Sequence, residues 1–248
     1  MKIRLDKLIV GRGLAPTRTR AQALILSGKV LVGEQKIEKA GTEVDTEATV
    51  RVLGGDLKYV SRGGLKLEKA LEHWCIDVAG KVCLDVGTST GGFTDCLLQH
   101  GAARVIAVDT GRGQIDFHLR QDARVRLLEN TNARYLTAEQ VGQSVDLIAM
   151  DVSFISATLV LPAVIGAAFP ATDERRSRQI IVLVKPQFEA GRDHVGKGGI
   201  VRDPEVQAAA VERVRQSLIG LGCTETDVIE SPILGGQGNR EFLLRGVF

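Results

Sequence analysis

Apolar residues in the larger, C-terminal part of the chain gather in short continuous runs, and segments with helical spacing separate these runs. The runs lie at residues 81–87, 104–109, 124–130, 145–151 and 179–185, and the helical segments lie at residues 65–74, 90–101 and 204–221. Short continuous apolar runs are typical of strands buried on both faces of a parallel sheet. This alternation predicts βαβ units in a mostly parallel sheet with helices on both faces. The last segment, residues 240–248, alternates apolar and polar positions and predicts an antiparallel strand.

The first 53 residues have a different pattern, which predicts two helices followed by short strands. A first helix with one apolar face is followed by a second helix that Thr17 or Thr19 can cap and that stops near Gly28. Residues 30–33 and 49–53 then alternate like half-buried strands. A small unit with two helices and a few strands is therefore expected.

A glycine-rich segment at residues 54–64 separates the two patterns. Glycine clusters between regular segments are typical of turns and linkers. We therefore predict a small α+β domain over residues 1–59 and an α/β domain with a Rossmann-like sheet over residues 60–248.

The charge of the chain is unevenly distributed. The net charge is only +2, but residues 1–39 contain nine Lys or Arg and three acidic residues, whereas residues 40–248 contain 23 and 27. A local basic segment favours contact with a polyanion. A basic face that contacts only solvent is the alternative interpretation.

Cysteine and histidine spacing supports neither a disulfide framework nor a metal site. The four cysteines and four histidines lack CxxC and HxxxH spacing, so we predict no bound metal. The N-terminus lacks the apolar core of a signal peptide, so we expect a cytoplasmic protein.

Residues 152–172 form an uncharged run of 21 residues, which is long enough to cross a bilayer. Pro162, Gly166 and Pro170 interrupt this run, and it directly follows a predicted strand. We therefore predict a buried helix of a layered fold there, and no membrane span.

The loop after the first predicted strand of the larger domain is rich in glycine. Ligands of open parallel sheets bind beyond the carboxyl ends of the strands, so this loop, DVGTSTGGF, is a candidate site. Gly87 allows a sharp turn, and Gly91 and Gly92 allow a ligand to approach a helix N-terminus. The loop is not a dinucleotide fingerprint, because Ser89 occupies a position that needs glycine to admit a pyrophosphate. The candidate cofactor-binding residues of this loop are Asp85, Gly87, Thr88, Ser89, Gly91, Gly92 and Phe93.

Asp109 ends the second predicted strand, 24 residues after Asp85. A carboxylate at this interval can accept hydrogen bonds from two ribose hydroxyls. A cofactor that contains adenosine but no pyrophosphate fits both features, which favours S-adenosylmethionine over NAD. Asn132, after the third strand, is a candidate for the adenine edge by its position, and Asp151 is a further candidate at the end of the fourth strand. A glycine turn with an acidic helix cap is the alternative for the glycines alone.

Two lysines and two acids form a second group of candidates. Lys66 lies on the helix before the first strand, Asp151 and Lys185 end strands, and Glu241 lies on the last strand. Lys66 and Glu241 could each be surface residues. Lys185 lies between an apolar run and a proline, where a surface lysine is unusual.

Five segments of the larger domain, SRGGLKL, DVGTSTGGFTD, MDVSFIS, VKPQFEAGR and GNREF, together resemble the TlyA family. The catalytic domain of that family resembles the FtsJ-type ribose methyltransferases. Residues 4–33 resemble the S4-type RNA-binding domain that the family carries. These segments span nearly the whole chain.

The resemblance implies transfer of a methyl group from S-adenosylmethionine to the ribose 2′-hydroxyl of cytidine in ribosomal RNA. It assigns a catalytic tetrad to Lys66, Asp151, Lys185 and Glu241. The short linker and the absence of a long C-terminal tail resemble a compact branch expected to act on the large ribosomal subunit, with the small subunit as a second candidate substrate.

A ribose hydroxyl must lose a proton as it attacks the methyl group, and we expect Lys185 to accept that proton while Asp151 orients it. Phe154 and Phe188 are candidates for stacking on a flipped nucleotide, and burial in the core is the alternative. The basic residues of the N-terminal domain expected to contact RNA phosphates are Arg4, Lys7, Arg18, Arg20 and Lys29.

Four other functions compete with this interpretation. Relatives have carried a haemolysin label, but only the uncharged run at residues 152–172 supports a membrane-active protein. A base N-methyltransferase would need two prolines where residues 151–154 read DVSF. A noncatalytic ribosome-binding factor and, more distantly, an NAD enzyme are the remaining alternatives.

Overall fold

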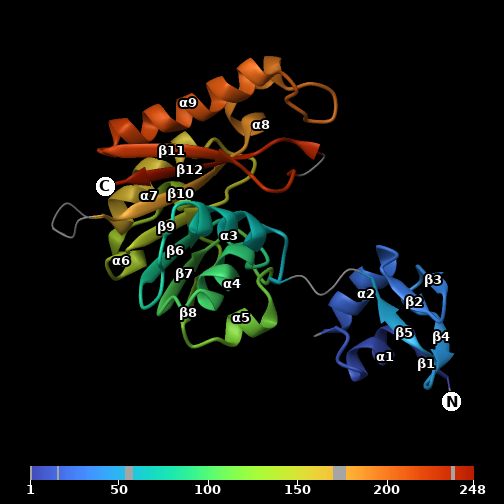
Figure 1. Cartoon of the computed structure of the whole chain (residues 1–248). Helices are drawn as coiled ribbons and strands as arrows, with labels where there is room; N and C mark the ends of the chain where they lie inside the picture. Colours follow the sequence, from blue (N-terminus) through green and yellow to red (C-terminus); the bar gives the residue numbers. More distant parts are fainter. Residues whose placement is uncertain (1, 16, 54–57, 170–176, 236–237) are drawn as a thin grey trace. The chain divides into compact units, whose positions relative to one another are not determined.

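The structure is a computed structural model, and it describes residues 2–15, 17–53, 58–169, 177–235 and 238–248. The chain divides into two compact units, Met1–Leu57 and Lys58–Phe248 (Figure 1). Each unit has its own buried apolar core, so each is described separately.

The first unit combines two helices with short antiparallel strands. Strand β1 pairs with β4, and β2 pairs with both β3 and β5. Thr17 caps the second helix, as predicted, because its Oγ1 accepts a hydrogen bond of 3.2 Å from the Arg20 N–H. Leu5, Ile9 and Ile25 are fully buried in the core between the helices and the strands. The elements are β1 (Lys2–Arg4), α1 (Leu5–Gly11), α2 (Arg18–Leu26), β2 (Val30–Val32), β3 (Gln35–Ile37), β4 (Glu43–Asp45) and β5 (Val50–Val52).

The second unit is built on a seven-stranded sheet in the order β11-β12-β10-β9-β6-β7-β8. The pairs from β10 to β8 are parallel, whereas β12 runs antiparallel to both β10 and β11. This confirms the predicted α/β fold with a mostly parallel, Rossmann-like sheet and an antiparallel last strand. The strands are β6 (Val82–Val86), β7 (Arg104–Val108), β8 (Val125–Leu128), β9 (Leu147–Met150), β10 (Gln179–Val184), β11 (Glu225–Glu230) and β12 (Phe242–Val247).

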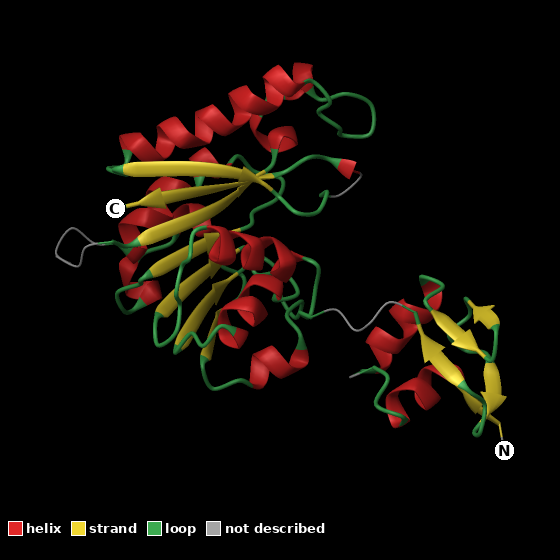
Figure 2. Cartoon of the chain, viewed as in Figure 1, coloured by secondary structure: helices red, strands yellow, loops and turns green. Residues whose placement is uncertain are grey.

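Helices cover both faces of this sheet, as Figure 2 shows in red against the yellow strands. Helices α3, α4 and α5 bury one core against the sheet, and α6, α7 and α9 bury another on the opposite face. Two apolar layers explain why the central strands are continuous apolar runs. The helices are α3 (Gly63–His73), α4 (Gly92–Gln99), α5 (Phe117–Gln121), α6 (Ala138–Val141), α7 (Leu161–Ala168), α8 (Pro186–Glu189) and α9 (Pro204–Gly220), with short 3-10 turns η1 (Ala133–Tyr135), η2 (Ala157–Leu159) and η3 (Arg192–His194).

Two features differ from the expectations. The uncharged run at residues 152–172 was expected to form one buried helix, but it contains a loop, the turn η2 and the short helix α7, and residues 170–172 lie outside the described part. Its proline at position 162 explains why α7 begins there, because proline favours the first turn of a helix. No strand was predicted where β11 lies. It is an edge strand, and its sequence, ETDVIE, carries charges at exposed positions, so it lacks an apolar pattern.

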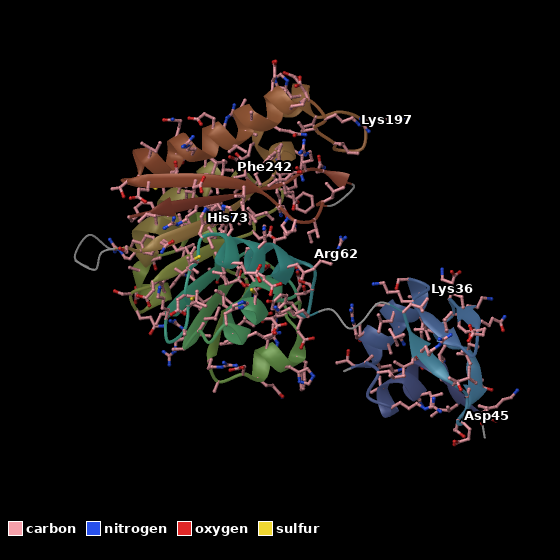
Figure 3. All side chains as sticks on the ribbon, viewed as in Figure 1. Lys36, Asp45, Arg62, His73, Lys197 and Phe242 are labelled. Carbon is pink, nitrogen blue, oxygen red and sulfur yellow. The ribbon has the colours of Figure 1, made fainter. Side chains whose placement is uncertain are left out.

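The register of the strands brings distant segments to one edge of the sheet. Val86 is paired with Met150, and Met150 with Val182, so β6, β9 and β10 end at the same edge. Because β12 is antiparallel, its first residue, Phe242, is paired with Val184 at the end of β10 (Figure 3). Glu241, which directly precedes β12, therefore lies at the edge where the parallel strands end.

Candidate active site

Lys185 and Asp151 form an ion pair at the carboxyl edge of the sheet. Lys185 Nζ lies 2.5 Å from Asp151 Oδ1 and donates a hydrogen bond of 2.7 Å to Ser153 Oγ. Lys185 directly follows β10 and is only 8% exposed. Its ammonium group therefore contacts a carboxylate and a hydroxyl at the end of the neighbouring strand β9.

Lys66 and Glu241 form a second ion pair at this edge. Lys66 Nζ, on α3, donates a hydrogen bond of 2.5 Å to Glu241 Oε2, and the two side chains are 10% and 3% exposed. A Cβ at position 235 would overlap Glu241 Oε1, so Gly235 provides the space in which the carboxylate lies. Removal of either partner from such a buried pair would leave the other charge buried and uncompensated.

The two ion pairs face adjacent cavities. Lys185 and Glu241 line a cavity of about 340 Å³, together with Ser153, Phe154 and Phe188. We call this the acceptor cavity. Lys66 and Asp151 line a second cavity of about 240 Å³. Because Lys66 pairs with Glu241 and Asp151 pairs with Lys185, the structure brings all four residues of the predicted tetrad together.

Phe154 has an unusual conformation at the mouth of the acceptor cavity. Its side chain is 91% exposed and its φ is +65°. Its ring centroid lies 5.4 Å from that of Phe188. A bulky residue with positive φ is strained, and such strain is typical of functional sites. The ring of Phe154 is therefore available for contact with a ligand, whereas Phe188 is half-buried.

The glycine-rich loop after β6 approaches the end of β9 closely. Gly87 has a φ of +87°, and a Cβ at this position would overlap the carbonyl oxygen of Asp151. Gly91 has a φ of +98°, and a Cβ there would overlap the side chain of Leu119. Both positions favour glycine by their backbone conformation, and Gly87 also requires it for steric reasons, because its neighbour is a backbone carbonyl.

Asp109 and Asn132 line a third cavity, of about 340 Å³, on the other side of this loop. Asp109 accepts hydrogen bonds from the backbone N–H groups of Ser89 at 2.7 Å and Gly111 at 2.6 Å, so its carboxylate is fixed at the cavity wall. Asn132 Oδ1 accepts a hydrogen bond of 3.0 Å from the Arg134 N–H. Each carboxylate oxygen of Asp109 retains capacity to accept a further hydrogen bond.

The two cavities beside the loop fit an adenosine cofactor. Gly87, Ser89 and Asp151 line both of them, so one elongated ligand can contact both sides of the loop. The glycines let this loop pack directly against the Asp151 carbonyl and Ser61, where a Cβ would overlap. An acidic residue at one end suits the ribose hydroxyls. Thr88, Gly92 and Phe93 line the 240 Å³ cavity.

Asp85 does not belong to the lining of these cavities. It is fully buried beneath the loop, where Oδ2 accepts a hydrogen bond of 2.6 Å from Thr94 Oγ1 and Oδ1 has no partner among the described residues. Burial raises the pKa of Asp85 to about 7. The structure thus places this predicted cofactor residue in support of the loop.

Helices α3 and α4 begin side by side, which explains two of the sequence motifs. A Cβ on Gly92 would overlap Ser61 Oγ and would lie 3.0 Å from the Gly64 backbone nitrogen. The SRGG and TGGF segments therefore meet, although they are far apart in the sequence. Ser61 and Gly92 both line the 240 Å³ cavity, which lies at these helix N-termini.

Glu189 fixes the loop that carries Ser153 and Phe154, a role that the sequence did not predict. Its carboxylate accepts hydrogen bonds from Ser156 Oγ at 2.5 Å and from the Ala157 N–H at 2.7 Å. Glu189 is 3% exposed, and burial raises its pKa. It lies within VKPQFEAGR and contacts the end of MDVSFIS, so the two motifs depend on one another.

Asn239 fixes another wall of the acceptor cavity. Its Oδ1 accepts a hydrogen bond of 3.0 Å from the Val201 N–H, and its Nδ2 donates one of 2.9 Å to the Gly199 carbonyl. Gln187 also lines this cavity, and its Oε1 has no partner among the described residues. Asn239 lies in the segment GNREF and Gln187 in VKPQFEAGR, but their positions in the sequence did not predict a role in the site.

The basic side chains predicted to contact RNA all lie in the first unit. Lys7, Arg18 and Lys29 are exposed, and Arg4 and Arg20 are half-buried. Arg4 and Arg18 both contact the carboxylate of Asp6. Their contact with RNA stays a prediction.

Within the part of the chain that the structure describes, no helix has both the length and the apolar character that a membrane span needs. The described residues also contain no group of three or more His, Cys, Asp and Glu side chains arranged to hold a metal ion.

The fold and the family model that matches this unit define a Rossmann-like methyltransferase. A solved S-adenosylmethionine-dependent methyltransferase from Mesorhizobium loti has this fold, with a TM-score of 0.53 and 14% identity over 73% of this chain and 96% of that chain. The FtsJ-like methyltransferase family matches residues 59–248, and the S4 domain family matches residues 3–50. The chain belongs to the FtsJ-like methyltransferases and, by the similarity of its full length, to the TlyA family.

Several relatives are similar over nearly the whole chain, including the following two. The 16S/23S rRNA (cytidine-2'-O)-methyltransferase TlyA from Mycobacterium tuberculosis is 47% identical over 98% of this chain and 89% of its own length. A solved structure from Streptococcus thermophilus, which carries a provisional hemolysin name, is 40% identical with a TM-score of 0.73, over 99% of this chain and 88% of that chain.

Proposed function

We propose that this chain transfers a methyl group from S-adenosylmethionine to the ribose 2′-hydroxyl of a cytidine in ribosomal RNA. The observation that carries the proposal is the convergence of Lys66, Asp151, Lys185 and Glu241 beside the acceptor cavity and the cavities of the glycine loop. The TlyA relative named above is a ribosomal RNA (cytidine-2'-O)-methyltransferase by name, which supports the same reaction.

The glycine loop and the strand ends would hold the cofactor. When bound, S-adenosylmethionine supplies a methyl group that its sulfonium already activates for attack. Asp109 would accept hydrogen bonds from the ribose, and Asn132 would face the adenine. Asp85 would support the loop from below. The remaining proposed cofactor-binding residues are Gly87, Thr88, Ser89, Gly91, Gly92, Phe93 and Asp151.

The chain would then have to orient the ribose and remove one proton. Lys185 Nζ would take that proton from the 2′-hydroxyl, which requires its neutral form. Asp151 and Ser153 would orient Lys185 through the contacts described above. Glu241 would hold Lys66 and limit the repulsion between the two lysines. Phe154 would stack on the flipped base.

The N-terminal part of the chain would bind the RNA. We propose an RNA-binding domain at residues 1–59 and a methyltransferase domain at residues 60–248. Phosphate contacts from this first domain would position the substrate without reading its sequence. The large ribosomal subunit is the proposed substrate, and the relative named for both subunits makes the small subunit the second candidate. The proposed location is the cytoplasm. The residues proposed for these phosphate contacts are Arg4, Lys7, Arg18, Arg20 and Lys29.

The decisive experiment replaces Lys185 with alanine. We expect methyl transfer to purified ribosomal subunits to be abolished, while calorimetric binding of S-adenosylhomocysteine is kept, because Lys185 lies in the acceptor cavity. Lys69→Ala is the matched control, since Lys69 is exposed on the same helix as Lys66. Near-normal turnover by Lys185→Ala would remove this residue as the base.

The same protein preparation separates the alternatives. A noncatalytic ribosome-binding factor would show no binding of S-adenosylhomocysteine. The hemolysin name of the relative from Streptococcus thermophilus predicts leakage of liposomes, which the proposed enzyme should not cause. Mass mapping of ribose methyl groups on the treated subunits would identify the nucleotide.

A further inference from the structure

Asp6 is a fully buried carboxylate that contacts three side chains in the first unit. It accepts hydrogen bonds from Arg4 Nε at 3.1 Å and Arg4 Nη2 at 2.9 Å. Arg18 Nε and Gln22 Nε2 each donate to its Oδ2 at 2.9 Å. The carboxylate itself is 0% exposed, so it is closed to solvent and to any ligand. The Arg4 guanidinium holds the pKa of Asp6 well below its usual range, so the group stays ionised.

The two arginines remain partly exposed on the outer side of this cluster. The side chains of Arg4 and Arg18 are 41% and 50% exposed. Both contact the same oxygen of Asp6, so their guanidinium groups lie side by side. Arg18 uses only Nε for this contact and Arg4 uses Nε and Nη2, which leaves other N–H donors of both groups for a ligand.

This arrangement suits a phosphate group. Two guanidinium groups and one carboxylate leave a net positive charge of one, and the guanidinium fork matches the oxygens of a phosphate. An arginine side chain that is already fixed loses less conformational freedom when it binds. A buried carboxylate that fixes both arginines would therefore favour phosphate binding without touching the phosphate.

We propose that Asp6 is a positioning residue that holds Arg4 and Arg18 as a preformed pair for one phosphodiester group of RNA. This inference rests on the proposed function and adds to it the residue that orders two of the phosphate contacts. It has an unusual consequence, because removal of a negative charge should weaken the binding of a polyanion.

The experiment compares two variants of the full chain that gain the same positive charge. Asp6→Asn removes the carboxylate that orders the pair, whereas Glu47→Gln removes an exposed carboxylate of the same unit. Binding to purified large ribosomal subunits is measured over a range of salt concentrations. We expect Asp6→Asn to bind about tenfold more weakly than the wild type, because two long side chains must then be ordered on binding. Glu47→Gln should bind equally or more tightly.

The salt dependence separates a positioning role from a general loss of structure. Both arginines keep their charge in Asp6→Asn, so the slope of log Kd against log salt should stay unchanged. Equal or tighter binding by Asp6→Asn would overturn the proposal, because the total charge would then determine the affinity.

Arg18→Lys provides a second variant if Asp6→Asn fails to fold, as judged by circular dichroism. It keeps the charge but lacks the fork, so we expect a similar loss of affinity with an unchanged salt slope. Unchanged affinity would overturn the inference. Failure of the proposed function would look different, because the wild-type protein itself would then neither bind nor methylate the subunits.

Discussion

Replacement of Asp85 with asparagine tests how a buried carboxylate beneath the glycine loop affects stability at different pH. Asp85 is fully buried, and burial raises its pKa from 3.8 to about 7. Between these two values the folded protein holds a proton that the unfolded chain has lost. The free energy of unfolding therefore falls as the pH rises through this range, and the full cost is present above pH 7.

The size of the effect follows from the same two values. Each unit of pKa corresponds to about 1.36 kcal/mol, so the rise from 3.8 to about 7 costs roughly 4 kcal/mol of stability at high pH. Part of that cost, roughly 1 to 2 kcal/mol, is already present at pH 5. Asparagine has a similar shape and does not titrate. We expect Asp85→Asn to gain roughly 2 to 3 kcal/mol relative to the wild type between pH 5 and pH 8.

Urea denaturation at several pH values measures this difference. The fluorescence of Trp74, the single tryptophan of the chain, reports on the second unit. Asp122→Asn is the matched control, because the hydrogen bond from Arg124 lowers the pKa of Asp122 and its contribution changes only in acid. A stability difference between Asp85→Asn and the wild type that does not change from pH 5 to pH 8 would refute the reasoning.

Three further predictions concern the site. Lys66→Met should destabilise the second unit by about 3 to 5 kcal/mol in denaturation experiments, because it leaves Glu241 buried without a partner. The double variant Lys66→Met, Glu241→Met should recover most of this stability without restoring activity. Phe154→Gly should raise the stability by about 1 kcal/mol, because it removes backbone strain, and should lower methyl transfer. Phe154→Ala should lower methyl transfer without raising the stability. Equal stability of the two variants would argue against strain. Gly235→Ala should displace the Glu241 carboxylate and cost about 1 to 3 kcal/mol, and unchanged stability and turnover would show that the carboxylate has room to move.

Some parts of the fold could be predicted from sequence because they depend on local pattern. Continuous apolar runs indicated the central strands, and helical spacing indicated α3, α4 and α9. The edge strand β11 and the loop before α7 were not predicted, because neither an exposed edge nor a break within an apolar run produces a clear period. The prediction of one long helix at residues 152–172 was wrong for the same reason.

The candidate site divides in a similar way. The sequence by itself determined which residues lie at the strand ends, because the strands and the glycine turns that follow them are recognised from patterns between neighbouring residues. Only the tertiary structure decided which of them meet. Lys66 pairs with Glu241 because β12 runs antiparallel and begins beside the end of β10. Such pairings depend on strand register between segments far apart in the chain, and no local spacing encodes that register.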